Sequence, residues 1–217
     1  MSRLIDLSHR IEHGRATYPG LPAPQVGPYR SHDSSTSEYS RDVGFHIAAV
    51  NIVGNTGTYT DAPFHRYANM PDIAAIDLER LVNLDAVCIA AVGVTLIDRD
   101  HFVGHVLHGK AVLVYTDWSR HWGTPAYFSG HPHLSAAAAR YLVEAGVVHV
   151  GIDSMNIDAT SDPDRPVHSR LLAAGIPITE HLTRLDQLPG RGSRFFAAPA
   201  PVCGAGSFPV RAFAIVD

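Results

Sequence analysis

The sequence lacks the features that mark several large classes of protein. It has only two cysteines in 217 residues, Cys88 and Cys203, too few for a disulfide-stabilised secreted scaffold. Both stand in apolar surroundings, so we expect reduced thiols in the core of a cytoplasmic protein, with a disulfide between them left open. No charged segment followed by an apolar stretch opens the chain, and we therefore expect no secretory signal.

Basic runs and long apolar runs are also missing. The formal net charge is -4, which gives no electrostatic reason to expect nucleic acid or a membrane surface as a partner. The longest apolar stretches have the length of strands, far below the ~20 residues of a membrane-spanning helix. There is no Gly-x-Ser-x-Gly elbow, no phosphate-binding loop and no dinucleotide fingerprint, and their absence excludes several enzyme classes.

The apolar content, by contrast, is sufficient for one sizeable core. Hydrophobic residues make up 46% of the chain and no linker divides it, so we expect one domain over residues 1–217. Residues 12–40 read as a long loop. The patterns predict strands over 4–8, 45–53, 86–92, 110–116, 147–152, 176–182, 194–199 and 210–216, and helices over 77–82, 135–145 and 167–174. Strands without polar alternation that follow helices are typical of a sheet covered by helices. The predicted fold class is therefore a mixed α/β domain.

The stretch from Asn55 to His65 (Asn-Thr-Gly-Thr-Tyr-Thr-Asp-Ala-Pro-Phe-His) holds the densest set of reactive side chains. In a straight strand, Asn55 and Asp61 would share a face but lie ~20 Å apart. Gly57 allows the chain to coil there, and Pro63 fixes the exit so that His65 points back towards Asp61. A strand and turn with a cap at Asp61 accounts for the same pattern without any chemistry, and both interpretations stay open.

A second informative stretch runs from Val167 to Glu180. In the predicted strand, Glu180 shares a face with Ile176 and Ile178, where a carboxylate is costly unless a metal, a donor or a proton compensates it. Alternatively, the strand ends near Thr179 and Glu180 is solvated. The weaker candidates read mainly as structural residues: His168 as a surface or capping residue, His131 and His133 as a loop and cap, and Asp153 and Asp158 as turn formers or pocket residues.

Together these segments resemble the cyclase superfamily, which includes bacterial kynurenine formamidase and isatin hydrolase. The family hallmark, His-x-Gly-Thr-His-x-Asp-Ala-Pro-x-His, aligns with residues 55–65. The further matches are Asp6-Leu-Ser-His, Tyr18-Pro-Gly, Gly151-Ile-Asp-Ser, the pair His168 and Glu180, and Pro209-Val-Arg-Ala. The resemblance implies a swivelling β/β/α-type fold, a homo-oligomer (dimer or tetramer), and hydrolysis of amides by water that divalent ions activate.

The resemblance also assigns roles to residues of this sequence. Asp61, His168 and Glu180 match the ligands of a metal site. His65 matches a residue that shuttles protons, and Tyr18 stands where formamidases carry a tryptophan that stacks on the substrate.

Two hallmark positions depart from the family pattern. Asn55 and Tyr59 replace two histidine ligands, and because an amide oxygen and a neutral phenol are poor ligands for zinc, that part of the metal site should be lost. One divalent ion, zinc or manganese, could remain at the other site, or none. Asn55 and Tyr59 would then contact the substrate.

We therefore predict a hydrolase that acts on an amide or cyclic amide of a small molecule, with water activated at a one-metal site. His65 and Glu180 would be catalytic. The aromatic residues Tyr18, Trp118, Trp122 and Tyr127 suggest a flat or aromatic substrate. A second hypothesis is a metal-independent cyclase, isomerase or lyase in which Asn55 and Tyr59 stabilise an oxyanion and His65 transfers protons. A third is a catalytically silent protein that binds a small molecule.

Overall fold

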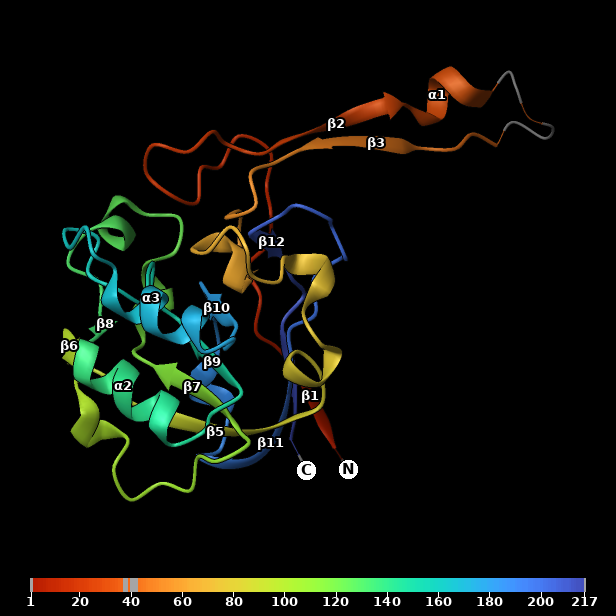
Figure 1. Cartoon of the computed structure of the whole chain (residues 1–217). Helices are drawn as coiled ribbons and strands as arrows, with labels where there is room; N and C mark the ends of the chain where they lie inside the picture. Colours follow the sequence, from red (N-terminus) through yellow and green to blue (C-terminus); the bar gives the residue numbers. More distant parts are fainter. Residues whose placement is uncertain (1, 37–38, 40–42, 217) are drawn as a thin grey trace.

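A curled, nine-stranded mixed sheet organises the computed structural model, which describes residues 2–36, 39 and 43–216 (Figure 1). The strand order is β1 (Arg3–Asp6), β13 (Phe213–Val216), β11 (Arg191–Phe196), β5 (Leu84–Ala90), β7 (Ala111–Tyr115), β9 (His149–Ile152), β10 (Ile178–Glu180), β4 (Tyr59–Asp61) and β12 (Ser207–Pro209). Strands β5, β7, β9 and β10 are parallel to one another, and the remaining pairs are antiparallel. The predicted α/β class is confirmed.

The central strands are apolar because both faces of the sheet are covered. Every residue of β9 is buried, as are the first four residues of β7. The helices α2 (Ala136–Glu144) and α3 (Pro166–Ala173) lie on one face (Figure 1). A second apolar cluster, which includes Leu113 and Phe195, fills the other face. As predicted, Ser135 caps α2, and Gly146 follows its end with a φ of 71°.

Short elements make the connections. They are the 3₁₀ helices η2 (Pro63–His65), η3 (Ile73–Ala75), η4 (Leu78–Arg80), η5 (Arg99–His101), η6 (Trp118–His121), η7 (Pro125–Phe128) and η8 (Leu185–Gln187), with a small pair of strands β6 (Leu96–Ile97) and β8 (His133–Leu134). The helix expected over 77–82 is the single turn of η4. No helix in the described part of the chain has the length and apolar character needed to cross a bilayer.

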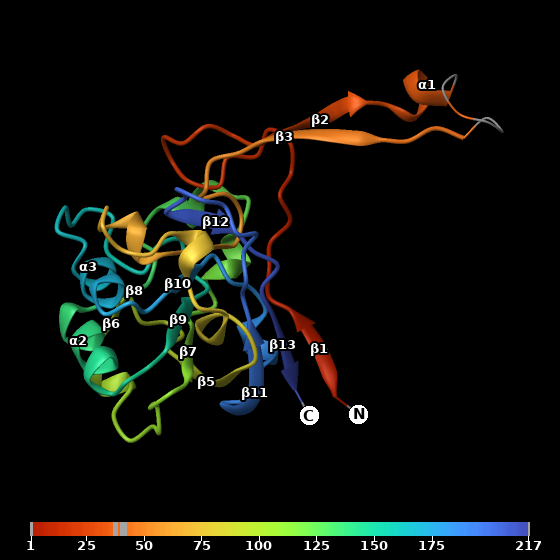
Figure 2. The ribbon, with the colours of Figure 1, turned by 45° about the vertical axis from the view of Figure 1, so that its right-hand side comes forward.

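Two predictions in the N-terminal quarter were wrong. The expected loop over 12–40 contains β2 (Gln25–Arg30) and α1 (His32–Ser35), while its residues 37, 38 and 40 lie outside the described ranges. The strand expected to be buried over 45–53 is β3 (Ile47–Asn51), and all of its residues are exposed. Strands β2 and β3 pair into a ribbon that projects away from the body (Figures 1 and 2). An apolar run indicates a strand but does not say what surface covers it.

The cysteine prediction was wrong in part. Both cysteines are free, so the open question of a disulfide between them is answered, but only Cys88 is half-buried and Cys203 is exposed. Cys203 follows Pro199-Ala-Pro-Val in a loop between β11 and β12, where a local apolar run does not reach the core.

Gly206, the residue before β12, lies very close to the backbone of His65 at the end of η2. A Cβ on Gly206 would lie 2.8 Å from Cα and 3.1 Å from the backbone nitrogen of His65, and both are backbone atoms that cannot rotate away. The Gly206 carbonyl accepts the Ala62 N–H at 2.8 Å, which fixes this approach. Because Gly206 has no side chain, the backbone of His65 can lie this close to it, and the position of His65 depends on that approach.

We expect Gly206→Ala to destabilise the protein by about 1–3 kcal/mol, because overpacking against backbone forces a shift. Urea unfolding followed by circular dichroism measures it. Gly190→Ala is the matched control, since its Cβ would meet only the Cys88 carbonyl oxygen, at 3.8 Å. Equal stability of the two variants would contradict the close approach.

Candidate active site

The register of β4 against β10 brings the two motif segments together. Tyr59 lies opposite Glu180, Thr60 opposite Thr179, and Asp61 opposite Ile178. Because side chains alternate along a strand, Tyr59, Asp61 and Glu180 share one face of the sheet. On the opposite face the hydroxyls of Thr60 and Thr179 lie 2.7 Å apart and secure the pairing. The β4 segment is coiled at its start, where Gly57 has a φ of 66°, as the sequence predicts.

Asp61 is a fully buried carboxylate without a hydrogen bond to either oxygen. Its nearest polar neighbours are His65 Nδ1, 3.7 Å from Oδ1, and His168 Nε2, 3.6 Å from Oδ2. Both distances are too long for hydrogen bonds and leave room for something between the groups. A charge buried without a partner is costly, so Asp61 needs a cation or a proton in the space that it faces.

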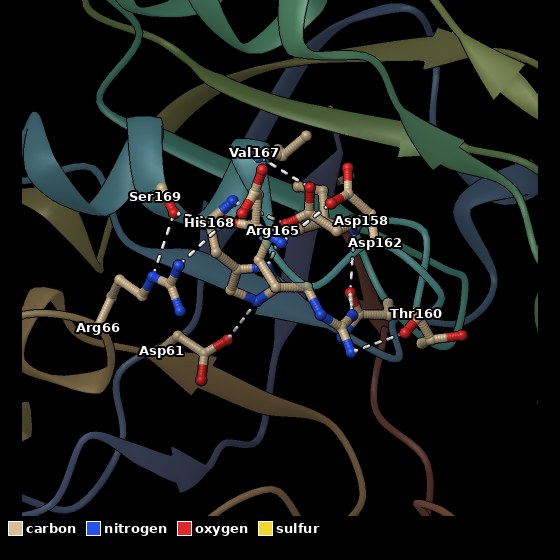
Figure 3. A network of polar contacts seen from close by, with 12 residues as sticks. Asp61, Arg66, Asp158, Thr160, Asp162, Arg165, Val167, His168 and Ser169 are labelled. Atoms are coloured by element: carbon tan, nitrogen blue, oxygen red, sulfur yellow. Dashed lines mark hydrogen bonds and ion pairs between the residues drawn. The ribbon is translucent and has the colours of Figure 1, made fainter.

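His168 is oriented by Asp158. Its Nδ1 lies 2.7 Å from Asp158 Oδ2, and the carboxylate of Asp158 also accepts the backbone N–H groups of Val167 and His168 at the first turn of α3 (Figure 3). The other ring nitrogen, Nε2, therefore faces Asp61 and Glu180, each 3.6 Å away. Burial opposes the imidazolium, but the hydrogen bond to Asp158 and the charges of Glu180 and Asp61 outweigh it and raise the pKa of His168 to about 10.

Glu180 is fully buried, so the solvated alternative was wrong. Its Oε1 accepts the Ile157 N–H at 2.6 Å, and its Oε2 accepts a very short hydrogen bond from the Tyr59 hydroxyl. Burial, together with the charge of Asp61, raises the pKa of Glu180 to about 7 against the lowering effect of the His168 charge.

The two positions that depart from the hallmark are each held by a hydrogen bond. Ser207 donates to the Asn55 amide oxygen at 2.9 Å, and the Tyr59 hydroxyl, in the same cavity lining as Asn55, donates to Glu180. Burial and the nearby carboxylates raise the pKa of Tyr59 well above its ordinary value, so its phenol stays neutral. Both side chains are thus used as hydrogen-bonding groups.

A cavity of about 270 Å³ opens above these groups. It is lined by Tyr18, Leu21, Asn55, Tyr59, His65, Arg66, Asn156, Arg165 and His168. Of the expected catalytic, metal-binding and substrate-binding residues, Asp61 and Glu180 are fully buried and do not line the cavity, whereas the others do. The side chain of His65 is 36% exposed, which suits a group that exchanges protons with water or substrate.

The aromatic residues expected near a substrate are divided. Tyr18 lines the cavity, but Trp118, Trp122 and Tyr127 do not. Trp122 instead stacks on His9, with ring centroids 3.9 Å apart, and Tyr127 is fully buried. Trp122 and Tyr127 pack in a separate cluster around His181, and the Trp118 indole N–H donates to the Tyr127 carbonyl.

Asp158, Arg165 and Arg66 are site residues that sequence reasoning missed or left undecided. Asp158 had been weighed as a turn former or a pocket residue, and its contact with His168 makes it part of the site. Arg66 directly follows His65, and Arg165 lies just before the segment that begins at Val167; this proximity is the one signal that the sequence offers. Their side chains contact Ser169 and Thr160, respectively, at the edge of the cavity (Figure 3).

The donor set fits one divalent ion but not two. Ligand atoms of Asp61, His65 and His168 lie within 4.8 Å of one another, and the buried oxygens of Asp61 are free to coordinate. A histidine whose second nitrogen is held by a carboxylate is the usual arrangement at metal sites. Glu180 is outside that group of three, although its Oε1 is close to His168 Nε2. A second ion does not fit at Asn55 and Tyr59, whose polar atoms are already bonded to Ser207 and Glu180.

We expect Asp158→Asn to lower the pKa of His168 from about 10 in the metal-free protein, because the charged acceptor at Nδ1 is lost. The variant should also lose about 1–3 kcal/mol of stability, because the buried N–H groups of Val167 and His168 would then donate to a neutral amide instead of a carboxylate. Titration of the ring protons by NMR measures the first effect, and urea unfolding the second. Asp162→Asn, on the same loop, removes a carboxylate that accepts only the Asp164 N–H and should change neither quantity appreciably. An unchanged His168 titration would contradict the assigned role of Asp158.

The sequence matches a known family. The Cyclase family model matches residues 5–159. A kynurenine formamidase of Bacillus thuringiensis subsp. konkukian is 28% identical over 215 residues, covering 97% of this chain and 96% of its own. One of Geobacillus thermodenitrificans is 29% identical over 214 residues, covering 98% and 97%.

Solved structures show the same fold. An isatin hydrolase bound to the product analogue thioisatinate superposes with a TM-score of 0.87 at 22% identity, over 99% of this chain and 92% of that one. A structure described as a potential metal-dependent hydrolase with cyclase activity gives 0.81 at 24% identity, over 100% and 99%. The family match spans well over half of the sequence, and this chain belongs to the cyclase family.

Proposed function

We propose that this protein is a hydrolase that cleaves an amide or cyclic amide of a small aromatic molecule, with a one-metal site. The observation that carries the proposal is the buried, unbonded carboxylate of Asp61 between His65 and His168 at the base of the cavity. The relatives named kynurenine formamidase match nearly the whole chain, and isatin hydrolases share its fold.

Asp61, His168 and Glu180 would hold the ion, zinc or manganese. Such an ion supplies a nucleophilic water at neutral pH and polarises a carbonyl group. His65 faces the cavity beside Asp61, where it can take a proton from water and return it to the leaving nitrogen. Asn55, Tyr59 and Tyr18 line the same cavity and would contact the substrate.

The wider setting of the proposal is a single domain over residues 1–217 in the cytoplasm, with a small-molecule substrate as partner. The main sheet takes strands from both ends of the chain, which supports one domain. Two free cysteines, one of them exposed, suit a reducing compartment.

A metal-independent reaction is the second candidate, and one observation favours it. With a pKa of about 10, a protonated His168 can itself lie between Asp61 and Glu180 and compensate their charges. The site would then use His65 as acid and base, and Asn55 and Tyr59 as donors to an oxyanion. The metal content of the purified protein separates the two candidates.

Protein purified without a polyhistidine tag should contain about one divalent ion per chain by elemental analysis. A chelator should abolish hydrolysis of an aryl formamide, and zinc or manganese should restore it. Asp61→Asn is expected to weaken metal affinity at least ~100-fold. The substitution removes a metal ligand itself, which should cost more than loss of a residue that only hydrogen-bonds to a ligand. Competition with a chromophoric chelator measures the affinity, and Asp100→Asn, an exposed carboxylate on η5, is the control.

Clean absence of metal, with turnover that survives the chelator, would replace the hydrolytic proposal with the metal-independent one. Full turnover in both His65→Ala and Glu180→Gln would remove the assigned chemistry from this site altogether.

The ribbon of β2 and β3 supports a homo-oligomer, dimer or tetramer. Its apolar side chains are exposed, with Val50 at 56% and Ile47 at 49%. A two-stranded hairpin alone is at best marginally stable in water. A groove of about 370 Å³ runs along the ribbon between His13, residues 25–28 and residues 49–51. A second copy of the chain would cover these surfaces.

Light scattering after size exclusion should therefore give a mass of two or four chains of 23.4 kDa. The double substitution Ile47→Lys and Val50→Lys should shift the protein towards the monomer, because charges would be desolvated in the contact. Val106→Lys, at an equally exposed apolar residue of the body, should leave the mass unchanged. A monomeric wild-type protein, or an oligomer indifferent to the ribbon substitutions, would disprove this assembly.

A further inference from the structure

The cavity has opposite charges at its base and its rim. The carboxylates of Asp61 and Glu180 lie behind the base, whereas the rim carries two arginines, Arg66 and Arg165. No function has so far been given to this pair. A pocket that is anionic at one end and cationic at the other selects for a ligand with a matching distribution of charge.

Arg165 is held in place but not neutralised. Its Nη1 donates to the Asn156 side-chain oxygen at 3.1 Å and its Nη2 to the Thr160 carbonyl at 3.3 Å, and Tyr18 lines the same cavity. All of these partners are neutral. In the described part of the chain, no carboxylate forms an ion pair with Arg165. The positive charge is therefore positioned and left available.

The backbone of Arg165 is constrained as well. It has φ and ψ of 46° and 59°, a left-handed conformation that is unfavourable for a residue with a side chain, and Pro166 follows it. A glycine would adopt this conformation more easily. The strain is retained together with a side chain that is directed to the rim of the cavity, which fits a role for that side chain in binding.

Arg66 repeats the arrangement from the other side of the cavity. Its Nε donates to the Ser169 hydroxyl at 3.1 Å and its Nη2 to the Asp164 carbonyl at 3.0 Å, again neutral oxygens. In the view of Figure 3, the side chains of Arg66 and Arg165 lie on opposite sides of the contact between His168 and Asp61. The two cations thus flank the place where a scissile group would lie.

We propose that the substrate carries a carboxylate, and that Arg165, assisted by Arg66 and the Tyr18 hydroxyl, binds it while the amide lies at His65 and His168. The inference rests on the proposed amide hydrolysis and adds the charge of the substrate to it. A guanidinium presents paired N–H donors that match the two oxygens of a carboxylate, and such charge-assisted bonds are among the stronger ones in proteins. Arg165 is accordingly a specificity-determining residue.

Two other roles for Arg165 make different predictions. If it only holds the segment from Asn156 to Thr160, its removal should weaken the binding of charged and neutral ligands alike. If it stacks on an aromatic ring, the charge of the ligand should again be irrelevant. Dependence on the ligand's carboxylate is therefore the deciding measurement.

The test uses two compounds with the same ring and formamide group, 2-formamidobenzoate and its neutral counterpart 2-formamidobenzamide. For the wild type, KM of the anion should be lower by about tenfold or more. Arg165→Gln should raise KM of the anion ~10- to 100-fold and change KM of the neutral compound far less, while Arg165→Lys restores part of the loss. Arg66→Gln should give the same selectivity in a smaller measure.

Arg170→Gln is the matched control, because it removes an exposed charge from α3, the helix that Arg165 precedes, outside the cavity lining. Equal KM values for the two compounds in the wild type would overturn the inference, as would equal increases for both in Arg165→Gln.

Failure of the proposed function can be distinguished from failure of this inference. If neither compound is hydrolysed, the hydrolytic proposal fails for aryl formamides, and calorimetric titration of the same two compounds decides the question of charge. Preferential binding of the anion that Arg165→Gln abolishes would support the carboxylate site. Binding without preference, or no binding of either compound, would overturn it.

Discussion

The burial of two carboxylates side by side is the constraint on which the rest of this site depends. Asp61 and Glu180 are both inaccessible to solvent on adjacent strands, and neither could remain charged there without compensation. In the described ranges, the one buried cation close to both is His168, so α3 has to lie where its third residue faces them. Asp158 in turn has to hold the opposite ring nitrogen. The docking of a whole helix thus follows from the charges of two strands.

Compensation by a proton and compensation by a metal compete for the same space. In the metal-free state, the proton on His168 compensates the charges of the two carboxylates, and these charges help to raise the pKa of His168 to about 10. A divalent ion would displace that proton, since a histidine ligand must be neutral. Metal affinity should therefore depend strongly on pH. The same geometry accounts for both candidate chemistries, and the ion decides between them.

Asn55 and Tyr59 are both held in place by neighbouring side chains. Ser207 donates to the Asn55 amide oxygen, and the Tyr59 hydroxyl donates to Glu180. Networks whose members are all satisfied are stabilising, whereas partly satisfied ones are costly. Tyr59 thereby fixes one oxygen of Glu180 and leaves the other to face His168. The departures from the hallmark are consistent with a site adapted to a single ion.

Much of the scaffold could be predicted from sequence, because its signals are local. The run Ala111–Tyr115 and the cap at Ser135 each specify their element without help from distant residues. The approach of His168 and Glu180 to Asp61 was available only through the family resemblance, since no local pattern encodes the pairing of β4 with β10. The exposed face of β3, the exposure of Cys203 and the hold of Asp158 on His168 depend on tertiary contacts that spacing does not reveal.

The segment from Asn55 to His65 also determines where β10 ends. His181 follows Glu180 with a φ of 57°, a left-handed conformation that turns the chain out of the strand. The Thr58 hydroxyl donates to the His181 carbonyl at 2.6 Å and accepts the His9 N–H at 3.0 Å, and these bonds hold the turn. Because Thr58 is one residue before the strand that carries Tyr59 and Asp61, a single short segment supplies the buried acid and also stops the neighbouring strand at Glu180.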